Sequence, residues 1–202
     1  MSGRTAVFGG TFDPIHNAHL EVARAAAASF SLERVLFVPS GTPPHKQGTL
    51  AAYEDRVRMA ELACIGEPKF EVSRVEEGTG PSYSIHTIER LMALGYRDLA
   101  FLIGADAFAE ITSWYRWQDL AGMVEFLVVT RPGAGYLVPA GIRMRELAGV
   151  WLDVSSSSVR TAFQSTDLDL DDIPVPAAVR GWILDHGLYR SQPLKISASH
   201  TL

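Results

Sequence analysis

The fold is decided at Thr5-Ala6-Val7-Phe8-Gly9-Gly10 and in the segment that follows it up to residue 39. Residues 5–8 are an apolar run of strand-forming side chains closed by two glycines, which predicts a buried strand. Apolar residues then recur at helical spacing and predict an amphipathic helix over residues 17–30. A second apolar run at 35–38 predicts another buried strand. Strand, helix and strand in this order indicate a βαβ unit with a right-handed parallel crossover.

The same alternation continues along the rest of the chain. Further strands are predicted at 70–72, 100–103, 125–130 and 150–152, and further helices at 53–64, 85–92, 157–163 and 176–186. Elements of these lengths in alternation predict an α/β fold, a Rossmann-like three-layer sandwich with a mostly parallel sheet and a helical C-terminal segment. We expect a single domain over residues 1–190 and a loose tail at 191–202, where no apolar period is visible.

The composition excludes several classes of protein. With 47% hydrophobic and 20% charged residues, the chain of 202 residues is an ordinary globular sequence. Its net charge of −5 and its lack of any Lys/Arg run argue against a nucleic-acid partner. We find no signal peptide and no apolar run near the ~20 residues of a membrane span, so we expect a cytoplasmic protein without a membrane partner. Cys64 is the single cysteine, which excludes an intramolecular disulfide and argues against structural zinc.

Residues suited to chemistry fall at the ends of predicted strands. In a parallel sheet, ligands bind outside the carboxyl ends of the strands, near the point where the strand order reverses. Four predicted strands lead into such segments, which are Gly9-Gly10, Ser40–Lys46, Gly104–Asp106 and Ser155–Ser158. We therefore expect the functional site at this edge of the sheet.

The first of these segments has the features of a phosphate-binding turn. Two glycines after a strand let the backbone approach a ligand closely, and the next helix directs its N-terminal N–H groups at the same place. His16 and His19 are three residues apart, so both imidazoles can face one side of the first helical turn and donate to phosphate oxygens. A structural role for both histidines in capping the turn is an equal alternative. Zinc binding by the pair lacks a third ligand nearby.

A second candidate phosphate segment lies near the other end of the chain. Residues 155–158 are a run of serines that suits a helix start, and Arg160 one turn later could bind phosphate oxygens bidentately. The alternative is a plain serine cap followed by a surface arginine. Together the two segments resemble the signatures of the nucleotidyltransferase α/β phosphodiesterase superfamily. Residues 9–20 resemble its T/HxGH motif, with Ala18 where glycine is usual, and residues 154–160 resemble its ISSTxxR motif.

Motifs in the middle of the chain indicate which family of this superfamily the sequence resembles. Pro43-Pro44-His45-Lys46 resembles the PPHK loop of bacterial nicotinate mononucleotide adenylyltransferases. Residues 81–88 resemble the SYTxDT segment of that family, although His86 stands where aspartate is usual, which puts the contact of that position in doubt. Residues 103–106 match its GAD motif, and residues 112–117 resemble its tryptophan segment. The resemblance runs from about Ala6 to Tyr189.

The resemblance implies three sets of site residues. The catalytic residues would be His16, His19 and Arg160. ATP would be bound by Gly9, Gly10, Thr11, Phe12, His16, His19, Gly104, Asp106, Ser156, Ser157 and Arg160, with Asp106 on the ribose. The mononucleotide would be bound by Asp13, Lys46, Ser84, Thr87, Trp114, Tyr115 and Arg131, with Trp114 stacked on the pyridine ring. Asp13 could contact the metal through water, or could equally only shape the turn.

The implied reaction joins ATP and nicotinate mononucleotide to give nicotinate adenine dinucleotide and pyrophosphate. The acceptor phosphate is already ionised, so a direct in-line attack needs neither a general base nor a covalent intermediate. Mg²⁺ would be carried by ATP, without a metal site built from protein side chains.

Other interpretations stay open at this point. The acceptor could be nicotinamide mononucleotide or phosphopantetheine, although Lys46 and Trp114 argue against the latter. A non-catalytic nucleotide-binding module could share the fold, but would be expected to lose His16, His19 or Arg160. Trp114 and Trp117 could both be core residues, and Lys46 could be a solvated loop lysine. The sequence is also compatible with a homo-oligomer.

Overall fold

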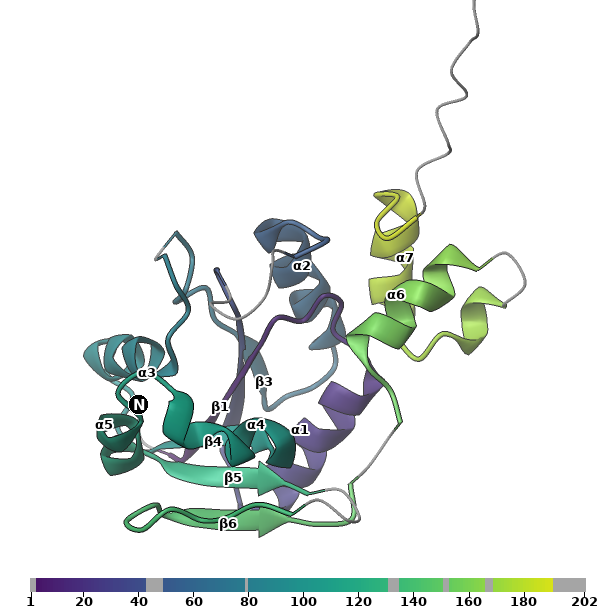
Figure 1. Cartoon of the computed structure of the whole chain (residues 1–202). Coiled ribbons are helices and arrows are strands. Elements are labelled where there is room, and N and C mark those ends of the chain that lie inside the picture. Colours follow the sequence, from purple (N-terminus) through teal and green to yellow (C-terminus); the bar gives the residue numbers. More distant parts are fainter. Residues whose placement is uncertain are drawn as a thin grey trace, which may run out of the picture.

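The computed structural model describes residues 3–42, 49–78, 80–130, 135–150, 153–165 and 169–190. Its strands are β1 (Thr5–Gly10), β2 (Arg34–Pro39), β3 (Phe70–Val72), β4 (Leu99–Gly104), β5 (Glu125–Val129) and β6 (Met144–Leu147). They form one sheet in the order β3-β2-β1-β4-β5-β6, and every pair of neighbours is parallel (Figure 1). This confirms the predicted Rossmann-like α/β fold. The strand order reverses between β1 and β4, where such sheets place their ligands.

Helices cover both faces of this sheet. They are α1 (Asn17–Ser29), α2 (Tyr53–Ala63), α3 (Ser84–Ala93), α4 (Ala105–Ala109), α5 (Trp117–Met123), α6 (Ser156–Gln164) and α7 (Ala177–Asp185), with short 3₁₀ turns at Ile111–Ser113 and Leu170–Asp172. None of the helices in the described ranges is long and apolar enough to cross a membrane.

The core consists of two apolar clusters, one on each face of the sheet. Neighbouring residues of a strand point to opposite faces, so Ala6 of β1 joins the cluster under α1, α2, α6 and α7. Val7 joins the other cluster, under α3, α4 and α5. Both residues are fully buried, as are the alternating side chains of β2. This burial on both faces explains why the central strands have continuous apolar sequences.

The last described strand lies at a position that the sequence did not predict. The sixth strand is β6 at Met144–Leu147, Val150 lies outside any strand, and residues 151–152 fall outside the described part of the chain. The reason is that β6 lies at the edge of the described sheet beside β5, and its Arg145 and Glu146 are exposed. Such a strand needs no apolar run. Residues 153 and 154, just before Ser155, lie outside any strand, and the expected loose tail at 191–202 lies outside the described residues.

Candidate functional site

The turn between β1 and α1 is built around Phe12. This residue has a left-handed backbone (φ 49°), and its buried ring packs edge-on against Phe8 and His19. A Cβ atom on Gly10 would lie 2.8 Å from the Phe12 ring, so the close approach requires glycine there. The Phe12 side chain thus belongs to the core, and only its backbone is available to a ligand.

His16 and His19 lie face to face at the start of α1. Their ring centroids are 3.7 Å apart, and the backbone N–H of His16 donates to Nδ1 of His19 over 3.2 Å. Since Nδ1 of His19 accepts this bond, the proton of its neutral ring is on Nε2. His16 is 4% exposed, and its burial lowers its pKa from 6.5 to about 4. At neutral pH, His16 is therefore an uncharged imidazole.

The lowered pKa of His16 predicts a specific pH dependence of stability. The unfolded chain takes up a proton near pH 6.5, whereas the folded chain does so only near pH 4. Above pH 6.5, His16 is neutral in both states and does not lower the free energy of unfolding. As the pH decreases from 6.5 to about 4, we expect the free energy of unfolding to fall by about 3 kcal/mol. Urea unfolding between pH 7 and pH 4 measures this effect, with His16→Gln as the comparison. Equal pH slopes in the two proteins would contradict the assignment.

Helix α6 joins this turn from the far end of the chain. The Ser156 hydroxyl donates to the Pro14 carbonyl over 3.0 Å, and the Arg160 guanidinium donates to the Asp13 carbonyl over 2.7 Å. Arg160 also donates to the Ser157 hydroxyl over 3.0 Å. The helix itself is capped by Ser155, whose hydroxyl accepts from the backbone N–H of Ser158. The two sequence segments that resemble superfamily signatures thus meet in space.

Two cavities open on opposite sides of the ends of β1 and β4. The smaller, of about 160 Å³, is lined by His16, His19 and Asp106 together with apolar residues. The larger, of about 480 Å³, includes Ser84, Thr87, Trp114 and Tyr115 in its lining. Phe8 and Gly104 line both cavities, so the two meet where the strand order reverses. A ligand in one cavity would therefore lie next to a ligand in the other.

Three residues that were predicted to bind ATP line the other cavity. Gly9, Gly10 and Thr11 line the larger cavity and not the smaller cavity with the two histidines. To contact these residues, ATP would have to reach the border between the two cavities. Lys46 and Arg131 lie outside the described residues, and their predicted contacts with the mononucleotide stay predictions.

The carboxylate of Asp13 is used within the fold. It is 5% exposed and accepts the backbone N–H groups of Leu50 and Ala51 at 2.8 and 3.1 Å. It also accepts the hydroxyl of Tyr189 at 2.7 Å, which contributes to raising the pKa of that tyrosine beyond the main effect of its burial. These three bonds favour a role in shaping the turn.

Thr87 is also tied to protein groups. It is 3% exposed, and its hydroxyl donates to the buried carboxylate of Glu76. Glu76 in turn accepts the backbone N–H of Gly41 over 3.2 Å and lines the larger cavity. Glu76 therefore fastens the loop after β2 to the first turn of α3, and Thr87 contributes through that link. No local sequence pattern points to Glu76, because Gly41 and Thr87 lie in two segments distant from it and from each other in the sequence.

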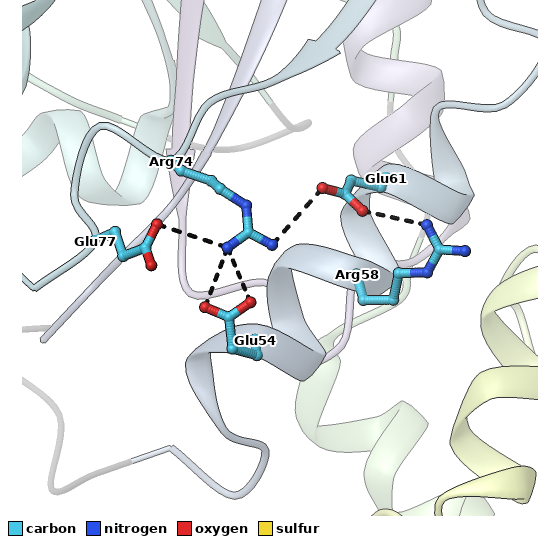
Figure 2. Close-up of polar contacts among 5 residues, drawn as sticks. All are labelled: Glu54, Arg58, Glu61, Arg74 and Glu77. Carbon is cyan, nitrogen blue, oxygen red and sulfur yellow. Dashed lines mark hydrogen bonds and ion pairs between the residues drawn. The ribbon is translucent and has the colours of Figure 1, made fainter.

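A cluster of ion pairs holds the turn that carries Glu76 against α2 (Figure 2). Arg74 donates to both carboxylate oxygens of Glu54 at 3.1 and 2.9 Å and lies 3.9 Å from Glu61, both on α2. It also lies 3.6 Å from Glu77, and Arg58 pairs with Glu61 over 3.2 Å. These side chains are largely exposed, so we assign them a local fastening role only.

Trp114 and Tyr115 stand at the apolar side of the larger cavity. Trp114 is half-buried, packs edge-on against Phe101 of β4 at 6.0 Å and lines the cavity. Tyr115 is 52% exposed, and its ring lies 4.8 Å from that of Tyr83. Trp117 is half-buried against the core and does not line the cavity. Both tryptophans thus pack against the core, but only Trp114 also lines the cavity.

His86, which departs from the family pattern, packs behind the cavity. Its ring contacts Tyr83 and Tyr115 edge-on, with centroids 5.8 and 5.7 Å away. Both tyrosines line the larger cavity, whereas His86 does not. Its place indicates support of the cavity rim.

Comparisons with known proteins agree with this geometry. Residues 7–162 match the cytidylyltransferase-like family. A protein of Solibacter usitatus described as a probable nicotinate-nucleotide adenylyltransferase is 53% identical over 92% of this chain and 99% of its own. A protein of Acidothermus cellulolyticus with the same description is 40% identical over 94% of this chain and 97% of its own.

Solved structures show the same fold. The nicotinic acid mononucleotide adenylyltransferase of Plasmodium falciparum, in a structure described as complexed with NaAD, superposes with a TM-score of 0.74 at 18% identity. The alignment covers 93% of this chain and 98% of that one. The fold, the two adjoining cavities and the sequence relatives lead to one family. This chain belongs to the cytidylyltransferase-like proteins and, among them, to the nicotinate-nucleotide adenylyltransferases.

Proposed function

We propose that this protein transfers the adenylyl group of ATP to nicotinate mononucleotide and so forms nicotinate adenine dinucleotide and pyrophosphate. The observation that carries the proposal is the pair of cavities that meet at Phe8 and Gly104. The smaller has two imidazoles and a carboxylate among apolar residues, and the larger has aromatic rings, hydroxyls and the carboxylates of Glu76 and Glu110. Two different nucleotides can thus be held with their phosphates at the shared border.

We assign ATP to the smaller cavity. Asp106 follows the end of β4, where a carboxylate can accept the two hydroxyls of a ribose. The phosphates would lie at the start of α1, within reach of the imidazoles of His16 and His19. Arg160, held against the Asp13 carbonyl, would supply the positive charge.

We assign the mononucleotide to the larger cavity. The indole of Trp114 offers an aromatic face to the pyridine ring. Ser84 is the first residue of α3, so the N-terminal N–H groups of this helix can receive the carboxylate of nicotinate. The phosphate would then lie near the loop after β2, which continues to Lys46 in the sequence.

The chemistry required of the protein is positioning and charge stabilisation. The acceptor phosphate is an anion and attacks without losing a proton, so the histidines act as hydrogen-bond donors and not as bases. In the described ranges, no group of three or more His, Cys, Asp or Glu side chains is placed to hold a metal ion. A Mg²⁺ carried by the phosphates of ATP would neutralise charge on the leaving pyrophosphate.

The proposal is tested by following pyrophosphate release from ATP, Mg²⁺ and one acceptor at a time. We expect turnover with nicotinate mononucleotide and much less with nicotinamide mononucleotide or phosphopantetheine. A preference for one of the other acceptors would overturn the assignment of the substrate. Binding of ATP without turnover of any acceptor would instead indicate a non-catalytic module.

The same assay tests the aromatic face of the larger cavity. Trp114→Ala should raise KM for the mononucleotide about tenfold, because a stacking contact of this kind contributes roughly 1 kcal/mol beyond its buried area. KM for ATP should change much less, and Trp114→Phe should recover most of the loss. Trp117→Phe is the matched control, since that residue does not line the cavity. Equal effects of Trp114→Ala on both KM values would argue against stacking.

A further inference from the structure

Arg56 is a buried positive charge that the proposed mechanism does not use. It lies on α2, is 1% exposed and is the largest fully buried side chain in the described part of the protein. Arginine is almost never fully buried unless it is paired, because removing a charge from water is costly. No carboxylate among the described residues forms a hydrogen bond or ion pair with it.

The partners of Arg56 are backbone carbonyls at the ends of two neighbouring strands. Its guanidinium donates to the carbonyl oxygens of Thr11 and Ser40, each over 2.7 Å, and lies 3.5 Å from the carbonyl oxygen of Gly41. Thr11 and Ser40 both line the larger cavity, after β1 and β2 respectively. The planar fork of a guanidinium can hold two such carbonyls at once, which an ammonium group cannot do with the same geometry.

The charged side chains that line the larger cavity are acidic, which gives the positive charge of Arg56 a role there. Among the described residues that line it, the charged side chains are Glu76 and Glu110, and both are acidic. The acceptor that we assign to it carries an anionic phosphate. Burial lowers the pKa of Arg56, opposed by the charges of Asp13 and Glu76, but a guanidinium keeps its proton in a protein. Arg56 therefore places a permanent positive charge behind a wall that otherwise presents carboxylates and carbonyls.

We propose that Arg56 is a positioning residue for the phosphate of the acceptor: it keeps the Thr11 and Ser40 carbonyls in place and supplies positive potential behind them. This inference rests on the proposed function, since it assigns the acceptor to the larger cavity. It concerns the phosphate and not the pyridine ring, so it predicts a difference between a mononucleotide and the corresponding riboside.

The test compares Arg56→Lys with wild type, and uses Arg58→Lys as the matched control. Arg58 lies on the same helix, is 47% exposed and pairs with Glu61 (Figure 2). In Arg56→Lys we expect KM for nicotinate mononucleotide to rise about tenfold, with KM for ATP nearly unchanged. Calorimetry without ATP should show the same loss of affinity for the mononucleotide and little loss for nicotinate riboside. The control should match wild type in every measurement.

Three results would overturn the inference. The first is a folded Arg56→Lys protein with wild-type KM values for both nicotinate mononucleotide and ATP. The second is an equal rise of these two KM values. The third is an equal loss of affinity for the mononucleotide and for the riboside. Arg56→Gln, which keeps one donor for a carbonyl, takes its place if Arg56→Lys does not fold. A wild-type protein that binds the mononucleotide but does not turn it over would contradict the proposed function. The calorimetric comparison would still test the role of Arg56.

Discussion

Replacing His19 by alanine is expected to lower kcat about 100- to 1000-fold, the usual loss when one donor to developing charge is removed. Nδ1 of His19 accepts the backbone N–H of His16, so a neutral His19 ring carries its proton on Nε2 and would donate to a phosphate oxygen from that nitrogen. His19 also lines the cavity that we assign to ATP. Steady-state pyrophosphate release with both substrates at saturation measures the effect.

The fold should survive this substitution, because His19 is only partly buried and its ring packs at the edge of Phe8 and Phe12. A thermal unfolding midpoint close to that of wild type would establish this. His186→Ala is the matched control, since that exposed histidine stacks on Trp182 and lines neither cavity. A folded His19→Ala protein with near-normal kcat would rule out the role we assign.

Arg160→Ala is expected to lower kcat about 100-fold, because a guanidinium provides both charge and a bidentate hydrogen bond to phosphate. Its partners in the structure are the Asp13 carbonyl and the Ser157 hydroxyl, neither of which neutralises its charge. Within the described ranges its other N–H groups form no hydrogen bond, and we expect them to donate to ATP. Arg160→Lys should restore only part of the rate, since an ammonium group cannot hold the Asp13 carbonyl and a phosphate in the same geometry.

The matched control for this prediction is Arg97→Ala. Arg97 is exposed and precedes β4, at the amino end of the sheet, whereas the site lies at the carboxyl end. We expect it to keep the wild-type kcat. If Arg160→Ala raised only KM for ATP and left kcat intact, Arg160 would hold the ground state of ATP and not the transition state.

The central strands and both signature segments could be predicted because their information is local. β1 and β2 are buried on both faces and so have apolar sequences, and β1 ends in its two glycines. β6 could not be predicted in the same way, because an edge strand with exposed Arg145 and Glu146 has no such run. Its position follows from pairing with β5, which is a contact between distant parts of the chain.

The site likewise has features that the local sequence indicates and features that depend on the fold. The identities of His16, His19 and Trp114 indicated a nucleotide site from the sequence, but the lowered pKa of His16 depends on burial that only the fold reveals. The sequence also contains a pattern that indicates the burial of Arg56. It lies three and four residues before Met59 and Ala60, so it shares the apolar face of α2, and a charge on such a face is unusual.

The turn after β1 also has a consequence for when the protein becomes active during its synthesis. The carbonyls of Asp13 and Pro14 are bound by Arg160 and Ser156, and the Asp13 carboxylate by Tyr189, which are contacts across 147, 142 and 176 residues. A ribosome makes the β1 turn first and its three partners last. The segments that form β1 to β5 are thus made before the residues that fasten the turn which we assign to ATP. We therefore expect adenylyl transfer to begin only after the residues around Tyr189 have been made.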